Sequence, residues 1–361
     1  MLRIIIFKEE RGMKRSLTFL LAVLLVLGLT ACGSSSTTPT TAPETKGEES
    51  KPSAETAQQQ APKSDEKVFI RIGTASLGGN FFPMGTALAL AFEETIDNVK
   101  ATGQATGGSS FNLTALDKKE LEVGLSQSVA VASAINGTGS FEGAPLDSIA
   151  TIANYHPTPS HIIIRKKANV KSFEDLKGKS LEMLAIGDGN EANAKKLLEA
   201  LGIGWDEIKP VYSGNRVQAA SALKTGKVDG IIDAAGLGSS WLVDVLGDGE
   251  DFDFIALTDE EIAKVTAKYP EFSKMNIPAA TYKGQDQEIQ AVANWTTINV
   301  RKDMDEELAY QITKAIFVNL DLLKERHDYF KSMSLETAPH DVVAPLHPGA
   351  EKYYKEVGAL K

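Results

Sequence analysis

The sequence predicts an α/β fold made of two units joined at a hinge. Short segments rich in β-branched and apolar residues alternate with segments of helical hydrophobic period, the pattern of largely parallel sheets covered by helices. Pro157 and Pro159, which cannot donate to a sheet, interrupt this pattern. The pattern then starts again near residue 172, so we expect two α/β units in succession.

Elements of the first unit follow from hydrophobic period and from proline and glycine positions. Pro83 sets φ for the first turn of the first helix. We expect a strand at 68–72, a helix at 84–95, a strand at 99–106, a helix at 111–119, a strand at 122–125, an apolar segment at 129–135, and β-rich segments at 148–155 and 161–165.

The second unit has clear helix ends. Ser172 and Asp175 form a capping box for a one-turn helix closed by Gly178, and Thr258 with Glu261 caps another helix. Between them we expect a strand at 180–186, a helix at 192–201, a strand at 210–212, a helix at 215–225, a strand at 230–234 and a helix at 239–246.

A late strand and helix have no glycine loop of their own, so we expect them to return to the first unit. The strand covers 295–300, and Asp303 with Glu306 caps a long helix. Its apolar residues form one core-facing stripe: Leu308, Ile312, Ile316, Leu320 and Leu323.

The chain then crosses between units near Arg165 and again near Thr297. Lobe 1 comprises residues 68–164 and 298–361, and lobe 2 comprises residues 165–297. Two crossings of this kind make a hinge.

Composition excludes several classes of protein. The chain of 361 residues carries a net charge of −10 and has no basic stripe, which argues against nucleic-acid binding. Its single cysteine, Cys32, rules out an internal disulfide or a cysteine-rich metal cluster.

The N-terminus has the pattern of a bacterial lipoprotein signal. Met13 opens a basic segment, an apolar run covers 17–29, and Leu-Thr-Ala precedes Cys32. We expect a signal peptide at 1–31, with translation starting at Met13, and a lipid anchor on Cys32 that holds the protein on the outer side of the membrane. The alternative is an uncleaved anchor, although the run is short for a span of about 20 residues.

Residues 33–67 are polar and proline-rich, so they cannot bury enough apolar surface to fold. We expect a tether with a coil dimension of roughly 35 Å. It would allow the folded part to move just above the membrane.

Polar loops near the predicted strand ends suggest that the function is to hold a small anion. Loops at 73–80, 105–112 and 186–191 combine glycines, which allow close backbone approach, with hydroxyl or amide side chains at helix starts. Gln127 and Ser128 end another strand, and Arg216 could pair with a carboxylate. The candidate ligand-binding residues are Thr74, Ser76, Gly79, Asn80, Gly108, Ser109, Gln127, Ser128, Gly189, Asn190 and Arg216.

Each candidate also has a plain interpretation. The loops could be ordinary βα turns, Ser128 a helix cap, and Arg216 a solvated surface residue. Three loops of the same chemistry favour one shared ligand.

Enzyme motifs are weaker. Gly187, Gly189 and Ala192 fit a dinucleotide fingerprint, but the motif is short and lies in an exported protein. The segment Gly-Leu-Ser-Gln-Ser at 124–128 lacks the final glycine of a nucleophile elbow. The five histidines have no metal-ligand spacing, and we expect His161 to be a core residue.

Several segments together resemble the TAXI family of solute receptors for tripartite (TRAP) transporters. The resemblance covers residues 68–361 and rests on Ile-Gly-Thr-Ala-Ser-Leu-Gly-Gly-Asn-Phe-Phe-Pro-Met-Gly at 72–85, Gln-Ala-Thr-Gly-Gly-Ser at 104–109, Gly-Leu-Ser-Gln-Ser at 124–128, Asp-Leu-Lys-Gly-Lys at 175–179, Ile-Pro-Ala-Ala-Thr-Tyr at 277–282, Gly-Gln-Asp at 284–286 and Leu-His-Pro-Gly-Ala-Glu-Lys-Tyr-Tyr at 346–354.

This resemblance implies a type II periplasmic-binding-protein fold, with two α/β lobes around a ligand cleft. It implies a receptor without enzymatic activity, cofactor or metal, which passes its ligand to a TRAP permease in the membrane. The ligand would be a small carboxylate such as glutamate, glutamine or 2-oxoglutarate. The alternative is an exported enzyme on the same scaffold that acts on a small acid.

Two positions depart from the family pattern. Asp188 stands where a serine is usual between two glycines, and Ala130 stands where an aromatic residue is frequent. An amino-acid ligand would need a partner for its ammonium group, for which Asp188 and Glu191 are candidates.

Overall fold

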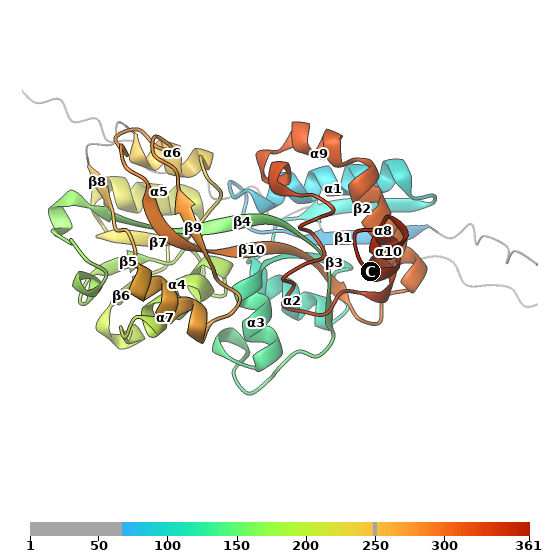
Figure 1. Ribbon diagram of the computed structural model, residues 1–361, viewed down its shortest axis with the longest axis horizontal. Helices are drawn as coiled ribbons and strands as arrows, with labels where there is room; N and C mark the ends of the chain where they lie inside the picture. The colour runs from blue at the N-terminus through green and yellow to red at the C-terminus, as the bar shows by residue number, and fades with distance from the viewer. Residues whose placement is uncertain (1–66, 248–250) are drawn as a thin grey trace, which may run out of the picture. The chain divides into compact units, whose positions relative to one another are not determined.

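The computed structural model describes residues 67–247 and 251–361, which belong to one compact unit (Figure 1). The predicted signal peptide, the lipid anchor at Cys32 and the tether up to residue 66 lie outside the described residues. Within the described ranges, no helix is both long enough and apolar enough to cross a membrane.

Lobe 1 is built on a five-stranded sheet in the order β2-β1-β3-β10-β4. β1, β2 and β3 are parallel, and β10 is antiparallel to both β3 and β4. The strands are β1 (Val68–Gly73), β2 (Val99–Gln104), β3 (Val123–Gln127), β4 (Ile149–Arg165) and β10 (Ile289–Arg301).

Helices cover both faces of this sheet. Side chains of α1, α8 and α10 form the core on one face, and those of α2 and α3 form the core on the other. The helices are α1 (Phe81–Thr95), α2 (Ser109–Asp117), α3 (Ser128–Asn136), α8 (Glu306–Val318), α9 (Leu320–Arg326) and α10 (Pro348–Glu356).

Lobe 2 repeats this arrangement with the order β6-β5-β7-β4-β8, in which β5, β6 and β7 are parallel and β4 is antiparallel to β7 and β8. Its helices again form cores on both faces, α4 and α7 on one and α5 and α6 on the other. The elements are β5 (Ser180–Glu182), β6 (Lys209–Val211), β7 (Gly230–Ala234), β8 (Phe252–Phe254), β9 (Ser273–Ile277), α4 (Gly189–Ala200), α5 (Arg216–Thr225), α6 (Ser240–Leu246) and α7 (Asp259–Lys268).

Short 3-10 helices complete the described chain. They are η1 (Gly139–Phe141), η2 (Lys166–Ala168), η3 (Glu174–Leu176), η4 (Trp205–Glu207) and η5 (Asp328–Ser332).

Two long strands connect the lobes. Figure 1 shows β4 and β10 running side by side from one lobe to the other, and they pair with one another in the middle. β4 changes its partner from β10 to β7 at Pro159, and β10 changes its partner from β9 to β3 between Ala293 and Thr296. Each lobe therefore contains part of a strand that begins or ends in the other.

The first crossing lies earlier in the chain than expected. Arg165 is the last residue of β4 and pairs with Phe252 of β8, whereas β10 passes from β9 to β3 just before Thr297. Pro157 and Pro159 do not break the strand: both lie in the last part of β4 that pairs with β10, just before β7 becomes the partner at Ser160.

The long C-terminal helix also differs from the expectation. Asp305, not Asp303, caps α8 by accepting a hydrogen bond from the Leu308 N–H. The helix ends at Val318, and Leu320 and Leu323 belong to the separate helix α9. Asn319 separates the two helices, and its amide donates to the Ala315 carbonyl and to Thr95 of α1.

Candidate functional site

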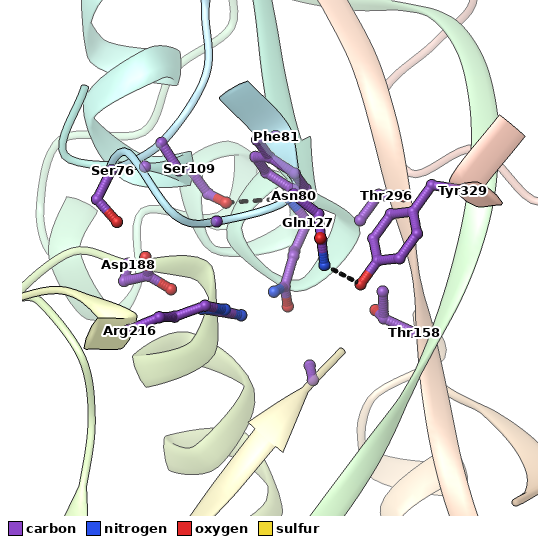
Figure 2. Close-up of a pocket in the computed structure, with 14 residues that line it drawn as sticks. Ser76, Asn80, Phe81, Ser109, Gln127, Thr158, Asp188, Arg216, Thr296 and Tyr329 are labelled. Atoms are coloured by element: carbon purple, nitrogen blue, oxygen red, sulfur yellow. Dashed lines mark hydrogen bonds between the residues drawn. The ribbon is translucent and has the colours of Figure 1, made fainter. Parts of the chain in front are cut away.

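A cavity lies between the lobes, next to the ends of β1, β3 and β7 (Figure 2). About 30 Å³ is open to the centre of a water molecule, roughly two to three times the 10–15 Å³ that one water needs. The described residues that line it are Ala75, Ser76, Gly79, Asn80, Phe81, Gly108, Ser109, Gln127, Thr158, Asp188, Arg216, Ala234, Thr296 and Tyr329.

Seven of the eleven candidate residues line this cavity, and six of them come from lobe 1, from the loops at 73–80 and 105–112 and from the end of β3. These six carry hydroxyl or amide groups or are glycines, so this wall is uncharged. Arg216 faces them from lobe 2 (Figure 2). The seven are Ser76, Gly79, Asn80, Gly108, Ser109, Gln127 and Arg216.

Three candidate side chains lie behind the cavity wall and hold it in place. The Thr74 hydroxyl donates to the Gln104 carbonyl at 2.6 Å, and the Ser128 hydroxyl accepts from the Trp295 N–H at 3.1 Å. The Asn190 carbonyl oxygen accepts from the Ala234 N–H at 2.8 Å. All three side chains are buried, so they position lining residues instead of facing the cavity.

Gly189, the fourth candidate outside the lining, lies at a close approach of the two lobes. A Cβ at this position would lie 2.5 Å from Ser109 Oγ and 2.9 Å from Gln127 Cγ, both in lobe 1. Glycine thus lets the first turn of α4 approach the opposite wall.

Arg216 belongs to a buried ionic group. Its Nη2 donates to Asp233 at 3.2 Å, and its guanidinium carbon lies 5.2 Å from the centre of the Trp241 ring. Burial raises the pKa of Asp233 to about 6 despite Arg216, and the Arg216 pKa is raised because Asp233 and Asp188 outweigh burial. Its buried Nε has no hydrogen-bond partner among the described residues, so this N–H can still donate to a ligand.

Asp188 is the second charged side chain in the lining. It caps α4 by accepting a hydrogen bond from the Asn190 N–H at 2.8 Å. Its Oδ2 lies 3.1 Å from the point where a Cβ of Gly108 would be, so it reaches the start of α2 in lobe 1. Burial raises the Asp188 pKa, against the lowering influence of Arg216 and of the Asn190 N–H.

Glu191, the other candidate partner for an ammonium group, faces away from the cavity. Its carboxylate binds Lys195, the Tyr212 hydroxyl and the Gly187 N–H. These contacts fix the loop before α4.

Tyr329 is a lining residue that the sequence did not point to. Its hydroxyl oxygen accepts from the Asn80 amide at 2.5 Å and from the Gly236 N–H of lobe 2 at 2.6 Å. Burial raises its pKa, so at neutral pH the hydroxyl keeps a proton that it can donate to a ligand. The ring stacks on His156 at 4.1 Å.

Further hydrogen bonds join the lobes around the cavity. The Ser110 N–H donates to the Gly187 carbonyl at 3.1 Å, and the Asn80 amide approaches the Ser239 hydroxyl at 3.4 Å. Together with the Gly236–Tyr329 contact, these hydrogen bonds join the two lobes beside the cavity.

The lining contains hydroxyl groups but, among the described residues, no histidine. Ser109 Oγ accepts a hydrogen bond from the Gln127 N–H, and the buried His161 contacts the Asp233 carbonyl and the Tyr282 hydroxyl. The cavity is thus suited to hold a polar molecule by hydrogen bonds and charge.

Comparison with known families and structures agrees with this fold. Residues 72–358 match the family described as the NMT1-like family. MatC from Rhodopseudomonas palustris with bound malate has 15% identity and a TM-score of 0.52, with 80% of this chain and 96% of that chain covered. A structure from Bordetella bronchiseptica has 16% identity and a TM-score of 0.50, covering 82% and 90%.

The alkanesulfonate-binding protein SsuA from Xanthomonas axonopodis pv. citri, bound to MOPS, has 15% identity and a TM-score of 0.44, covering 82% of this chain and 81% of that chain. The likeness to MatC and to the Bordetella structure, with the strand order, confirms the predicted two-lobed α/β fold.

Proposed function

The chain belongs to the NMT1-like family, and from this premise we propose that it is an extracytoplasmic solute-binding receptor of a transport system. In this proposal the receptor captures a small carboxylate between its lobes and delivers it to a membrane permease. It does not transform its ligand.

One observation carries the proposal: the cavity has uncharged donors on one lobe and Arg216 on the other. Hydroxyl and amide groups of Ser76, Asn80 and Tyr329 can bind carboxylate oxygens from lobe 1, while Arg216 binds them from lobe 2. A ligand that contacts both lobes favours closure, because it forms these contacts together only in the closed state.

The finer assignment rests on the resemblance to TAXI receptors. It favours a TRAP permease as partner and a ligand of the glutamate, glutamine or 2-oxoglutarate type. The malate bound to MatC supports a small carboxylate, since that protein shares the fold.

We propose that Cys32 carries the lipid that anchors the receptor to the outer face of the cytoplasmic membrane. The polar segment that follows provides reach between the anchor and the folded part. The receptor can then meet its permease while remaining on the membrane surface.

A thermal-shift screen of small acids tests the proposal. A bound compound raises the melting temperature with concentration, following RT ln(1 + [L]/Kd). Mass spectrometry of the compound after incubation must show it unchanged. Turnover would favour an exported enzyme on this scaffold, and no shift with any acid would contradict the carboxylate assignment.

A further inference from the structure

We propose that Asp188 makes the cavity selective for a zwitterion of net charge zero, with an ammonium group beside its carboxylate, and that it discriminates against acids without the ammonium group. This inference rests on the proposed function and defines the ligand class for the same site. Within the glutamate, glutamine and 2-oxoglutarate group, it favours the neutral amino acid.

The charge balance of the site is the first argument. Asp188 and Arg216 are the charged residues of the described lining, and Asp233 lies directly behind Arg216. With both carboxylates ionised, the group has one positive and two negative charges. Arg216 forms its ion pair with Asp233, and although its charge also acts on Asp188, no ion pair joins Asp188 to a cation among the described residues.

The position of Asp188 is the second argument. Its carboxylate accepts from the Asn190 N–H through Oδ1, while Oδ2 faces the opposite lobe at Gly108. Figure 2 shows Asp188 beside Arg216 and below Ser76 and Ser109. A ligand ammonium placed here would contact Asp188 and remain close to a carboxylate held by Arg216.

The two walls then have separate roles. Arg216 retains donor capacity at Nε, and the donors of Asn80 and Tyr329 lie across the cavity. A zwitterion finds a partner for each of its charges. A dicarboxylate brings two negative charges to a group that is already negative, and like charges at close range in a water-poor site repel strongly.

A charged ligand side chain is disfavoured for the same reason. No lysine lines the cavity in the described part of the chain, and Arg216 is the one cation of that lining. The site can therefore balance one ligand carboxylate but has no second cation for another. This distinguishes glutamine from glutamate, which have nearly the same shape.

Titration calorimetry with matched ligands tests the inference. The probes are alanine with propanoate, and glutamine with glutaramate, glutamate and 2-oxoglutarate. We expect the wild type to bind a neutral amino acid at least about tenfold more tightly than the acid lacking its ammonium group. Asp188→Asn should reduce that ratio several-fold, because the charge is lost while a side-chain oxygen can still cap α4.

Asp206→Asn is the matched control, since it removes one negative charge from an exposed position of lobe 2. It should leave the ligand ratio unchanged. Asp188→Ser, which also retains a capping oxygen, serves as a second variant if Asp188→Asn does not fold.

The outcomes separate this inference from the proposed function. If the wild type binds an acid without an ammonium group as well as the matched amino acid, the inference fails but the receptor for a carboxylate remains. An unchanged ratio in both Asp188 variants also overturns it. If no probe of either kind binds, both the inference and the proposed function are contradicted.

Discussion

Gly189→Ala should act as a wedge between the lobes. Gly189 is the first residue of α4, and it does not have the positive φ that favours glycine. A methyl group there would lie 2.5 Å from Ser109 Oγ and 2.9 Å from Gln127 Cγ. Both atoms belong to the opposite lobe, so the clash exists only when the lobes are closed.

The size of the effect follows from these distances. Ordinary van der Waals contact begins at 3.4 Å, so the methyl group overlaps Ser109 Oγ by 3.4 − 2.5 = 0.9 Å. Overpacking of this kind costs about 1–3 kcal/mol, which corresponds to an affinity loss of about 5- to 150-fold. Alanine is also the better helix former, so the stability of the free protein should not fall.

Titration calorimetry, with a ligand from the thermal screen, measures the affinity, and thermal unfolding measures the stability of the free variant. Gly204→Ala is the control, because its methyl group would contact a flexible side chain, that of Asp206, within the same lobe. It should bind as the wild type does. Wild-type affinity in Gly189→Ala would refute the reasoning that closure brings these surfaces together.

Four further predictions concern single residues. Arg216→Gln should weaken carboxylate binding at least about tenfold in calorimetry. Because it leaves Asp233 unpaired, it should also lower the free energy of unfolding by about 3–5 kcal/mol in urea. Unchanged affinity would show that Arg216 does not bind the ligand. Tyr329→Phe leaves the Asn80 amide and the Gly236 N–H without their acceptor and should weaken lobe closure by about 1–3 kcal/mol. The loss should be measured as a lower ligand affinity, and wild-type affinity would contradict this role of Tyr329. Burial lowers the pKa of His161 from 6.5 to about 4, so as the pH falls the unfolded chain takes up this proton before the folded protein does, and the stability that depends on the neutral imidazole is complete above pH 6.5 and decreases toward pH 4. At pH 5 the loss in unfolding free energy is about 2 kcal/mol, and His161→Gln should reduce the difference in unfolding free energy between pH 7 and pH 5 by that amount. An unchanged difference would argue against a neutral buried imidazole. Cys32→Ser should move the protein from the membrane to the soluble fraction or block its processing, and normal signal cleavage with full membrane retention would exclude the lipid anchor.

Local sequence signals predicted most helices and strands. The strand at 230–234 matches β7, and the capping box of Thr258 and Glu261 opens α7 as expected. Asn215 caps α5, and Gly226 closes it in the left-handed conformation. These features depend on neighbours within a few residues, so they can be recognised in the sequence.

Long-range contacts position the lining residues that the sequence did not indicate. Tyr329 lies in η5, far along the chain from the glycine loops, and reaches the cavity only through the packing of lobe 1. Thr158 and Thr296 line the cavity from the two crossing strands, whose continuity through Pro157 and Pro159 depends on their pairing partners. No local pattern marks these positions.

The glycine loops indicated where the cavity lies, but they did not identify which of their side chains face it. They predicted that 73–80, 105–112 and 186–191 converge, and residues of all three loops line the cavity. Within them, the division between lining and supporting residues depends on side-chain direction. Thr74 and Asn190 therefore resemble binding residues in sequence, although their side chains bond to the backbone behind the wall.

Small-angle scattering with and without saturating ligand is the most direct test of the claim that capture occurs by lobe closure. We expect a bound small carboxylate to lower the radius of gyration, with saturation at one ligand per chain, because both lobes contact it. If a ligand binds at one site and the radius of gyration stays the same, the cleft does not close on its ligand, and the central claim is contradicted.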